Sequence, residues 1–440
     1  MTQTDERGTP PGTKSMGRSL AASAVGNLLE WYEWSIYAVF APFIAAAMFS
    51  PGDPVSALLS TFAVFAVGFG MRPLGGIVFG RIADRRGRKF VLVTTMLMMA
   101  AGSFAIGLLP TYASIGAGAS LLLLAIRMVQ GFAHGGESAT ANVYIAEIAP
   151  RDRRGMWGSV VFGAIFGGSS LAYALGGGLT ATVGTAVVAD WAWRLPFLLG
   201  GVLALFVLIL RRQMDESEIF ETTSTDDGNE AVDTVETAVP RVDVVRSILL
   251  VIGLTAGVAA AHYTWTSYIS TYAITEQGMN VNSAYWVSVC AQVLALASIG
   301  LWGRLSDTIG RRPLLAGFAV AMLVLQIPLT RLISDQPWTL LVASGVALVF
   351  VAAAGAVLAA TMAELFPTRI RTQAVGFTYA TSVAVFGGTA PYLNQLFVSL
   401  DAKWAFSAYI MALCVVVLLT LRVTPETRGM DLSDAGSRRR

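Results

Sequence analysis

Long apolar runs alternate with short polar segments along almost the whole chain. Because a helix of about 20 apolar residues crosses the hydrocarbon core of a bilayer, each run predicts a membrane-spanning helix. Several runs exceed this minimum, which indicates tilted or kinked helices. The pattern predicts about twelve spans, at 19–48, 55–79, 90–110, 118–147, 156–183, 192–211, 246–275, 282–302, 313–333, 338–365, 373–400 and 402–422.

One connection between the apolar runs is long and rich in Asp and Glu, at 212–245. Such a composition favours a solvated linker, which divides the spans into two groups of six. The predicted organisation is a disordered tail at 1–17, an N-terminal half at 18–211, the linker, a C-terminal half at 246–422 and a second tail at 423–440.

Basic residues concentrate in alternate loops. Most of the 30 Lys and Arg residues fall in the tails, the linker and the loops on one side, whereas the loops of the other side contain Arg194, Arg331 and Lys403. Since cytoplasmic loops are enriched in basic residues, we expect both termini to be cytoplasmic. The sequence thus predicts an all-α, multi-pass protein of the cell membrane.

Composition supports this fold class and excludes other functions. Charged residues make up 13% of the 440 residues, against about 25% in soluble domains. The net charge of +2 is spread over short loops, so nucleic acid is not an expected partner. Cys290 and Cys414 lie in apolar runs and are interpreted as packing residues. The sequence shows no nucleophile–base pair, metal-ligand cluster or phosphate loop, so we expect no enzyme, metal or cofactor.

A short motif occurs twice, at 80–89 and at 303–312, with Asp84 and Asp307 in equivalent places. Two other motifs recur in the same order, Glu147-Ile148-Ala149-Pro150 with Glu364-Leu365-Phe366-Pro367, and Gly167-Gly168 with Gly387-Gly388. The repeat predicts two pseudo-symmetric six-helix halves, an arrangement typical of transporters.

These motifs resemble the major facilitator superfamily and, within it, the metabolite:proton symporters. The resemblance covers about 17–430 and rests on the loop motif with Gly26–Glu33, Met71–Gly76, Arg127–Glu137 and Glu364–Arg369. It implies alternating-access transport of a small organic acid or zwitterion. The chain departs from the group at Glu33, Ser35 and His134, where Asp, Gly and Ser are usual.

The repeated loop motif is interpreted as a conformational latch that closes the cytoplasmic side. Asp84 would cap a neighbouring helix or pair with Arg88 or another arginine, and Asp307 would act more weakly in the second copy. The alternative is ordinary anchoring by basic residues. The latch residues proposed from the sequence are Gly80, Asp84, Arg85, Gly87, Arg88, Asp307 and Arg311.

Ionisable residues inside the predicted spans concentrate in the N-terminal half. Each costs about 3 kcal/mol or more at mid-bilayer, so it needs a partner, a water-filled cavity or a function. Polar residues recur at steps of three and four in span one and span four. The two stripes consist of Asn27, Glu30, Glu33 and Tyr37 in span one, and Arg127, Gln130, His134 and Glu137 in span four.

We interpret Glu33 and Arg127 as a proton-coupling pair, with Glu30 and Glu137 as a second pair. A low dielectric favours a protonated carboxyl, and an adjacent guanidinium favours its ionised form. An Arg127 that approaches and leaves Glu33 would therefore drive proton release and uptake on opposite sides. The resemblance implies the same roles, because in sugar-carrying relatives the residues that align with Glu33 and Arg127 are the coupling acid and its partner. The alternative is a permanent ion pair between the two helices.

The expected substrate cavity combines both halves. Its residues are Asn27, Tyr37, Gln130, His134, Trp265, Tyr268, Tyr272 and Tyr379. Trp265, Tyr268 and Tyr272 are predicted to share one helix face. Uncharged aromatic and amide groups suit a polar or zwitterionic solute, including a quaternary ammonium ion. The alternatives are an aromatic belt at the membrane interface and, for His134, helix packing.

Arg72 is another arginine inside a predicted span. It is interpreted mainly as a snorkelling residue that braces the loop motif. The alternative role for Arg72 is that of an anchor for a substrate anion.

The function favoured by the sequence is proton-coupled uptake of a small organic acid or zwitterionic compatible solute. The alternative is a proton-driven exporter, although exporters of this fold usually carry a Gly-Pro motif that span five lacks. Expected partners are protons, the solute and the lipid bilayer. We expect the protein to act as a monomer.

Overall fold

The computed structural model describes residues 13–212, 241–367, 370–430 and 432. Within its helices, some side chains lie outside the described set, at 13–25, 84, 88–89, 136–148, 207, 209–212 and 241–243.

The N-terminal half contains six spans, three of which are preceded by short helices in the loops. The spans are α1 (Thr13–Val39) with α2 (Ala41–Met48), α3 (Pro54–Gly70) with α4 (Arg72–Arg86), α5 (Arg88–Leu108), α7 (Ala117–Ile148), α8 (Arg154–Thr182) and α10 (Leu195–Arg212). The loop helices are α6 (Tyr112–Ile115), η1 (Arg151–Arg153), α9 (Thr185–Asp190) and η2 (Ala192–Arg194).

The C-terminal half repeats this pattern. Its spans are α12 (Arg241–Tyr263) with η3 (Thr264–Tyr268) and α13 (Ile269–Gln277), α14 (Val281–Ile309), α15 (Arg311–Leu332), α16 (Pro337–Leu365), α17 (Arg371–Ser382) with η4 (Val383–Gly388) and α18 (Ala390–Ser399), and α19 (Lys403–Val423).

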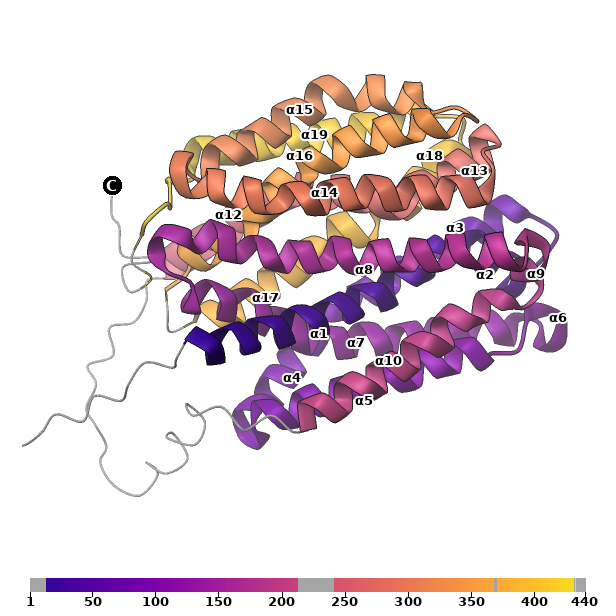
Figure 1. The fold of residues 1–440 in the computed structure, drawn as a ribbon, viewed down its shortest axis with the longest axis horizontal. Helices are drawn as coiled ribbons and strands as arrows, with labels where there is room; N and C mark the ends of the chain where they lie inside the picture. Colours follow the sequence, from indigo (N-terminus) through magenta and orange to yellow (C-terminus); the bar gives the residue numbers. More distant parts are fainter. Residues whose placement is uncertain (1–12, 213–240, 368–369, 431, 433–440) are drawn as a thin grey trace, which may run out of the picture.

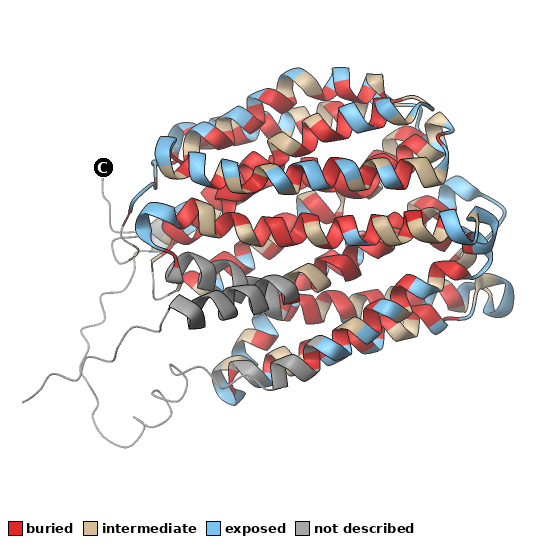
Figure 2. Cartoon of the chain, viewed as in Figure 1, coloured by how far each residue is buried: buried red, intermediate tan, exposed pale blue. Residues whose placement is uncertain are grey.

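Nine segments of the described chain are long and apolar enough to cross a membrane. The other three spans are α1 with α2, the shorter α10, and the span divided into α17, η4 and α18. The predicted fold of about twelve helices in two halves is confirmed. Figure 1 shows the helices lying roughly parallel, with α8 of the first half beside α14 of the second, and Figure 2 shows buried residues along their facing sides.

Each copy of the loop motif is mostly helical and turns at one glycine. Gly87 separates α4 from α5 with φ of 86°, and Gly310 separates α14 from α15 with φ of 103°. A side chain disfavours this left-handed region, which glycine enters without strain. The turns place both motifs at the same end of the bundle, which we call the signature end.

Two spans of the C-terminal half contain π-helical turns, at η3 and η4. A π-helical turn adds a residue to the helix turn and is frequent at functional sites. It also rotates all later side chains relative to the earlier ones. Helix faces read from regular three- and four-residue spacing therefore do not persist through η3 or η4.

Glycines bring the span of α3 and α4 into backbone contact with α7. A Cβ added at Gly131 would overlap the carbonyl oxygen of Gly68, and one added at Gly135 would overlap that of Arg72. Contact between small residues is a common basis of helix packing in membranes. It holds α7 in register with α3 and α4.

We predict that Gly131→Ala destabilises the protein, because the obstacle is backbone rather than a flexible side chain. Overpacking of this kind costs about 1–3 kcal/mol or more. Gly70→Ala is the matched control, because its new Cβ would meet nothing within 4 Å. Thermal unfolding in detergent, followed by size-exclusion chromatography, should show a melting temperature several degrees lower for Gly131→Ala alone. Equal melting temperatures would contradict the packing argument.

Candidate functional site

Glu33 points into the N-terminal half rather than toward the C-terminal half. Its carboxylate accepts a hydrogen bond from Ser103 of α5, and Gln130 of α7 donates to the same hydroxyl at 3.1 Å. On its other side the carboxylate lies against Gly200 of α10. Glu33 is 3% exposed, so its surroundings are protein and a small cavity beside Met99.

Arg127 lies among aromatic rings. Its guanidinium carbon is 4.0 Å from the ring centre of Tyr37 and 5.3 Å from that of Trp34. Its side-chain nitrogens have no hydrogen-bond partner among the described residues, and none lies within 4.0 Å of a Glu33 oxygen. The expected Glu33–Arg127 ion pair is therefore not formed in this conformation. A cation over an aromatic face is stabilised by about 0.5–2 kcal/mol.

Glu30 contacts His134 across α1 and α7. The carboxylate meets Nδ1 of the imidazole, and both side chains are buried. The His134 ring lies edge-on to Trp31 and Trp34, with centroids 5.9 and 5.6 Å away. The predicted partner of Glu30, Glu137, has a side chain outside the described set. His134 thus belongs to a polar pair within the N-terminal half.

Arg72 is buried in the middle of its span, which corrects the interpretation that it snorkels. The side chain is 3% exposed. Its guanidinium carbon is 3.6 Å from the ring centre of Phe69 and 4.2 Å from that of Trp34. The interpretation was wrong because α4 continues as a helix to Arg86, so the loop motif extends beyond the point where the sequence alone would end the span.

A small cavity lies between the halves near Arg72. Trp31 and Phe162 line it from the N-terminal half, and His262, Tyr263 and Tyr379 line it from the C-terminal half. Of these five, Tyr379 was expected in the substrate cavity. His262 and Tyr263 were not selected by the sequence analysis, although they occur in the aromatic run of span seven. The aromatic run itself was a signal for these two residues. They were missed because the cavity-lining face of span seven was predicted from regular helical spacing, which the π-helical turn η3 interrupts.

The three aromatic residues predicted to share a face contact different spans. Trp265 donates to Gln326 of α15 at 3.0 Å, whereas Tyr268 donates to Gln395 of α18 at 3.2 Å. Tyr272 packs against the ring of Phe406 in α19 at 5.9 Å. In this conformation none of the three lines the cavity between the halves.

The remaining predicted cavity residues support helix contacts. Asn27 donates to the carbonyl oxygen of Val161 in α8 at 3.2 Å. The Tyr37 hydroxyl donates to the backbone carbonyl oxygen of Thr61 in α3 at 3.0 Å. Gln130 donates a hydrogen bond to the hydroxyl of Ser103, which in turn lies next to Glu33. In this conformation none of the three residues lines the cavity between the halves.

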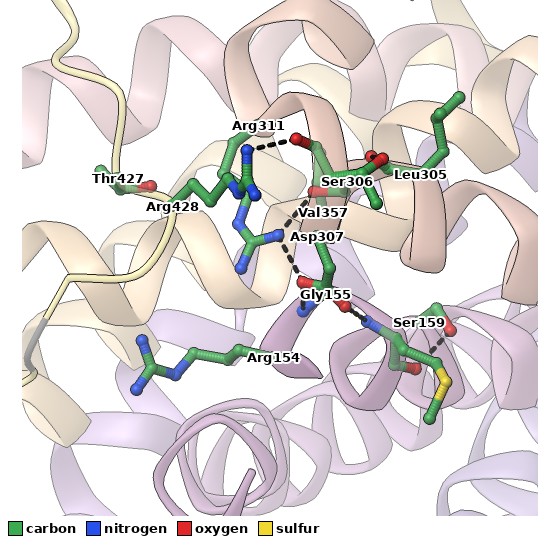
Figure 3. A network of polar contacts seen from close by, with 12 residues as sticks. Arg154, Gly155, Ser159, Leu305, Ser306, Asp307, Arg311, Val357, Thr427 and Arg428 are labelled. Atoms are coloured by element: carbon green, nitrogen blue, oxygen red, sulfur yellow. Dashed lines mark hydrogen bonds and ion pairs between the residues drawn. The ribbon is translucent and has the colours of Figure 1, made fainter. Parts of the chain in front are cut away.

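Asp307 joins the two halves at the signature end (Figure 3). Its carboxylate accepts hydrogen bonds from the backbone N–H groups of Gly155 and Met156, at 2.8 and 2.9 Å, which cap the start of α8. Arg311 donates to the same carboxylate at 2.8 Å and to Ser306 at 2.7 Å. Charge-assisted bonds of this type are among the strongest in proteins. The second copy of the motif thus has the geometry of an interdomain contact.

Glu364 adds a second layer to this contact. It forms ion pairs with Arg154 of the N-terminal half at 3.1 Å and with Arg311 at 3.4 Å. Thr427, in the segment after α19, donates to it at 2.6 Å. The sequence singled out Glu364 as part of a repeated motif but assigned it no role.

The first copy of the motif is less fully described. The side chains of Asp84 and Arg88 lie outside the described set, so their predicted contacts are not seen. Arg85 is exposed, and a Cβ at Gly80 would meet nothing within 4 Å. Gly87 provides the left-handed turn between α4 and α5.

Neutral hydrogen bonds join the halves at the opposite end. Tyr285 of α14 donates to the carbonyl oxygen of Val39 in α1 at 2.8 Å. Tyr173 of α8 lies 2.6 Å from the hydroxyl of Ser270 in α13. The cavity near Arg72 is therefore flanked by contacts between the halves at both ends.

Two halves that meet around a cavity and are joined at both ends are typical of a transporter. Comparisons with known proteins identify the family. A model described as "Sugar (and other) transporter" matches residues 19–240, and the Major Facilitator Superfamily model matches residues 252–438. The chain belongs to the major facilitator superfamily, and it is a multi-pass transporter of the cell membrane.

Its relatives transport several kinds of solute. The chain is 33% identical to the alpha-ketoglutarate permease of Escherichia coli, over 97% of this chain and 98% of that protein. It is 35% identical to the ectoine/proline transporter ProP of Corynebacterium glutamicum, over 90% of this chain and 80% of that protein. It is 30% identical to the citrate-proton symporter of Klebsiella pneumoniae, over 89% of this chain and 87% of that protein.

The structure of the proton:xylose symporter XylE bound to 6-bromo-6-deoxy-D-glucose shows the same fold. Its TM-score is 0.76 at 18% identity, and the match covers 94% of this chain and 97% of that one.

We predict that Asp307→Ala opens the signature end, because it removes two bonds to backbone N–H groups and one ion pair. Hydrogen bonds to charged groups contribute about 1.5–3 kcal/mol each, so the population of the open form should rise at least tenfold. Spin labels at Arg153 and Arg304, on opposite sides of the contact, would report this in pulsed EPR after replacement of Cys290 and Cys414.

The control for this experiment is Asp335→Ala, which removes an exposed carboxylate. The distance distribution of the control should match that of the unmodified protein. An unchanged distribution in Asp307→Ala would contradict the latch.

Proposed function

We propose that the protein is a proton-coupled symporter that takes up a small organic acid or zwitterionic solute by alternating access. The observation that carries this proposal is the separation of two buried, oppositely charged groups in one half. Glu33 is held by Ser103 while Arg127 rests on Tyr37. The similarity to the citrate-proton symporter of Klebsiella pneumoniae supports the same activity.

Arg127 is well placed to alternate between two partners. Tyr37 follows Glu33 by four residues on α1, so the ring and the carboxylate lie one helical turn apart. A modest sliding of α7 against α1 would move the guanidinium from the ring to the carboxylate. In the first arrangement the low dielectric favours a protonated carboxyl at Glu33, and in the second the guanidinium favours proton release.

Glu30 and His134 form a second proton-binding pair in this proposal. Both lie in the N-terminal half, next to Arg72, whose guanidinium interacts electrostatically with the Glu30 carboxylate. An imidazole and a carboxylate in contact share one proton, and the pair binds a second proton when both groups are protonated. Glu137, one turn after His134, remains a proposed member of this group.

Alternating access follows from the contacts at the two ends. Opening toward the signature end requires the Asp307 cap on α8 to break, and opening toward the other end requires Tyr285 and Tyr173 to release their partners. The proposed cycle breaks one set at a time around the central cavity. The latch residues of the first motif, with Asp84 and Arg88, would assist at the signature end.

We predict that Glu33→Gln abolishes accumulation driven by a proton gradient, because the amide neither binds nor releases a proton at that position. Proteoliposomes would be given labelled 2-oxoglutarate, citrate, shikimate, proline or glycine betaine, with and without an inward proton gradient. The unmodified protein should accumulate one compound in response to the gradient. Exchange of that compound without a gradient should persist in the variant.

Glu276→Gln is the matched control for this experiment. Glu276 pairs with Lys403 at 2.9 Å at the end of the bundle opposite the signature end, and its loss should leave coupling intact. Gradient-driven accumulation that survives in Glu33→Gln would refute its coupling role. Net efflux against the solute gradient when protons flow the other way would establish an exporter instead.

A further inference from the structure

Arg72 has unused hydrogen-bonding capacity in the centre of the protein. Its Nε and Nη2 atoms have no hydrogen-bond partner among the described residues, although the side chain is buried. The rings of Phe69 and Trp34 pack against the guanidinium. Their centres are 4.6 Å apart, so both rings lie toward the same side of the guanidinium and leave N–H donors unsatisfied. A buried cation with free donors requires an acceptor.

Two other polar groups lie beside Arg72 at the edge of the cavity between the halves. The Nδ1 atom of His262 has no hydrogen-bond partner in the described part of the chain, and the hydroxyl of Tyr263 interacts with the Arg72 guanidinium but donates to no described group. Both residues line the cavity, and Tyr263 and Tyr379 interact electrostatically with Arg72. Buried polar groups are nearly always hydrogen-bonded in native proteins. Arg72 does not itself line the cavity, but it lies next to Trp31, Tyr263 and Tyr379, which do. Polar groups of both halves therefore meet beside one cavity with donors left over, which indicates a ligand that supplies acceptors.

We propose that Arg72 anchors the carboxylate of a small monocarboxylate anion whose uncharged, apolar body is held between the two halves at this cavity. The cavity measures about 10 Å³ in the closed conformation, so the halves separate to admit the anion. Tyr263 donates a hydrogen bond to the same carboxylate, and His262 contacts the body or a polar substituent on it. This inference rests on the proposed transport function. It narrows the proposed substrates, small organic acids and zwitterions, to monocarboxylates.

The environment of Arg72 favours one carboxylate over two or three. The ring contacts described for the other deep guanidinium, Arg127, are with the N-terminal half, at Trp34, Tyr37 and Phe197. Arg72, in contrast, interacts with Tyr263 and Tyr379 of the C-terminal half, which line the cavity. A second carboxylate in the cavity would therefore have no cation to pair with, and burial without a partner is costly.

The cavity lining favours an apolar body over an ammonium group. No described lining residue is acidic, and a large part of the wall is aliphatic, formed by Ile165, Val258, Leu358 and Val383. The rings of Trp31 and Trp34 already have the Arg72 guanidinium within 5.6 and 4.2 Å. A second cation over these rings would be repelled by the first, whereas an apolar group gains about 25 cal/mol for each Å² removed from water.

A panel of compounds of similar shape tests this assignment by direct binding. The probes are 3-methylbenzoate (one carboxylate), N-methylnicotinate (a carboxylate with a cationic ring), isophthalate (two carboxylates) and 3-methylbenzamide (no charge). Binding to the purified protein in detergent would be measured by calorimetry, without a membrane or a proton gradient. We expect 3-methylbenzoate to bind at least tenfold more tightly than each of the other three.

Variants locate the site. Arg72→Gln should weaken binding of 3-methylbenzoate by about 30-fold or more, as expected for loss of a buried charged partner. Tyr263→Phe removes only the hydroxyl that interacts with Arg72 and keeps the ring, so the fold should persist while binding weakens by about three- to tenfold. The matched control is Arg194→Gln, which removes an arginine over Trp193 outside the cavity and should bind normally.

Each outcome decides the proposal. Tighter binding of N-methylnicotinate or isophthalate, no binding of 3-methylbenzoate, or full affinity in Arg72→Gln would overturn it. If Arg72→Gln does not fold, full affinity in Tyr263→Phe overturns it and reduced affinity supports it. Binding as expected without proton-driven uptake would refute symport but leave the site intact. Proton-driven uptake of a zwitterion alone would refute the site and leave symport intact.

Discussion

Charges in the membrane interior have to be shielded from lipid, and the N-terminal half is arranged around that requirement. Arg72 and Arg127 lie on aromatic faces, Glu33 lies beside a serine hydroxyl, and Glu30 lies beside His134. None of these environments is as strong as a direct ion pair between arginine and carboxylate. Each charge is therefore held in a place that it can leave, which is what a coupling mechanism needs.

Backbone contact between helices makes this arrangement possible. Gly68 and Arg72 approach Gly131 and Gly135 so closely that a methyl group does not fit. The span of α3 and α4 therefore lies directly against α7, and Arg72 and Arg127 both reach Trp34 of α1. Two guanidinium groups thus share one indole, which links the surroundings of the cavity with the coupling pair.

The two ends of the interface are closed by different chemistry. At the signature end a half-buried carboxylate, Asp307, caps α8, and Glu364 joins Arg154 to Arg311. At the opposite end the bonds are neutral, from Tyr285 and Tyr173 to backbone or hydroxyl oxygens. Charge-assisted hydrogen bonds are about twice as strong as neutral ones. The closed signature end is accordingly the more strongly held of the two.

The sequence by itself determined the spans, the two halves, the repeated motif and the concentration of charges in the N-terminal half. These follow from hydropathy and the thickness of a bilayer, which act on each segment separately. Only the tertiary structure decided which charge faces which group. Arg127 rests on Tyr37 rather than Glu33, Arg72 is buried, and Trp265 and Tyr268 bond to different spans. The reason is geometric: each residue turns a helix by about 100°, so a π-helical turn or a close glycine contact redirects side chains in ways that spacing along the chain does not reveal.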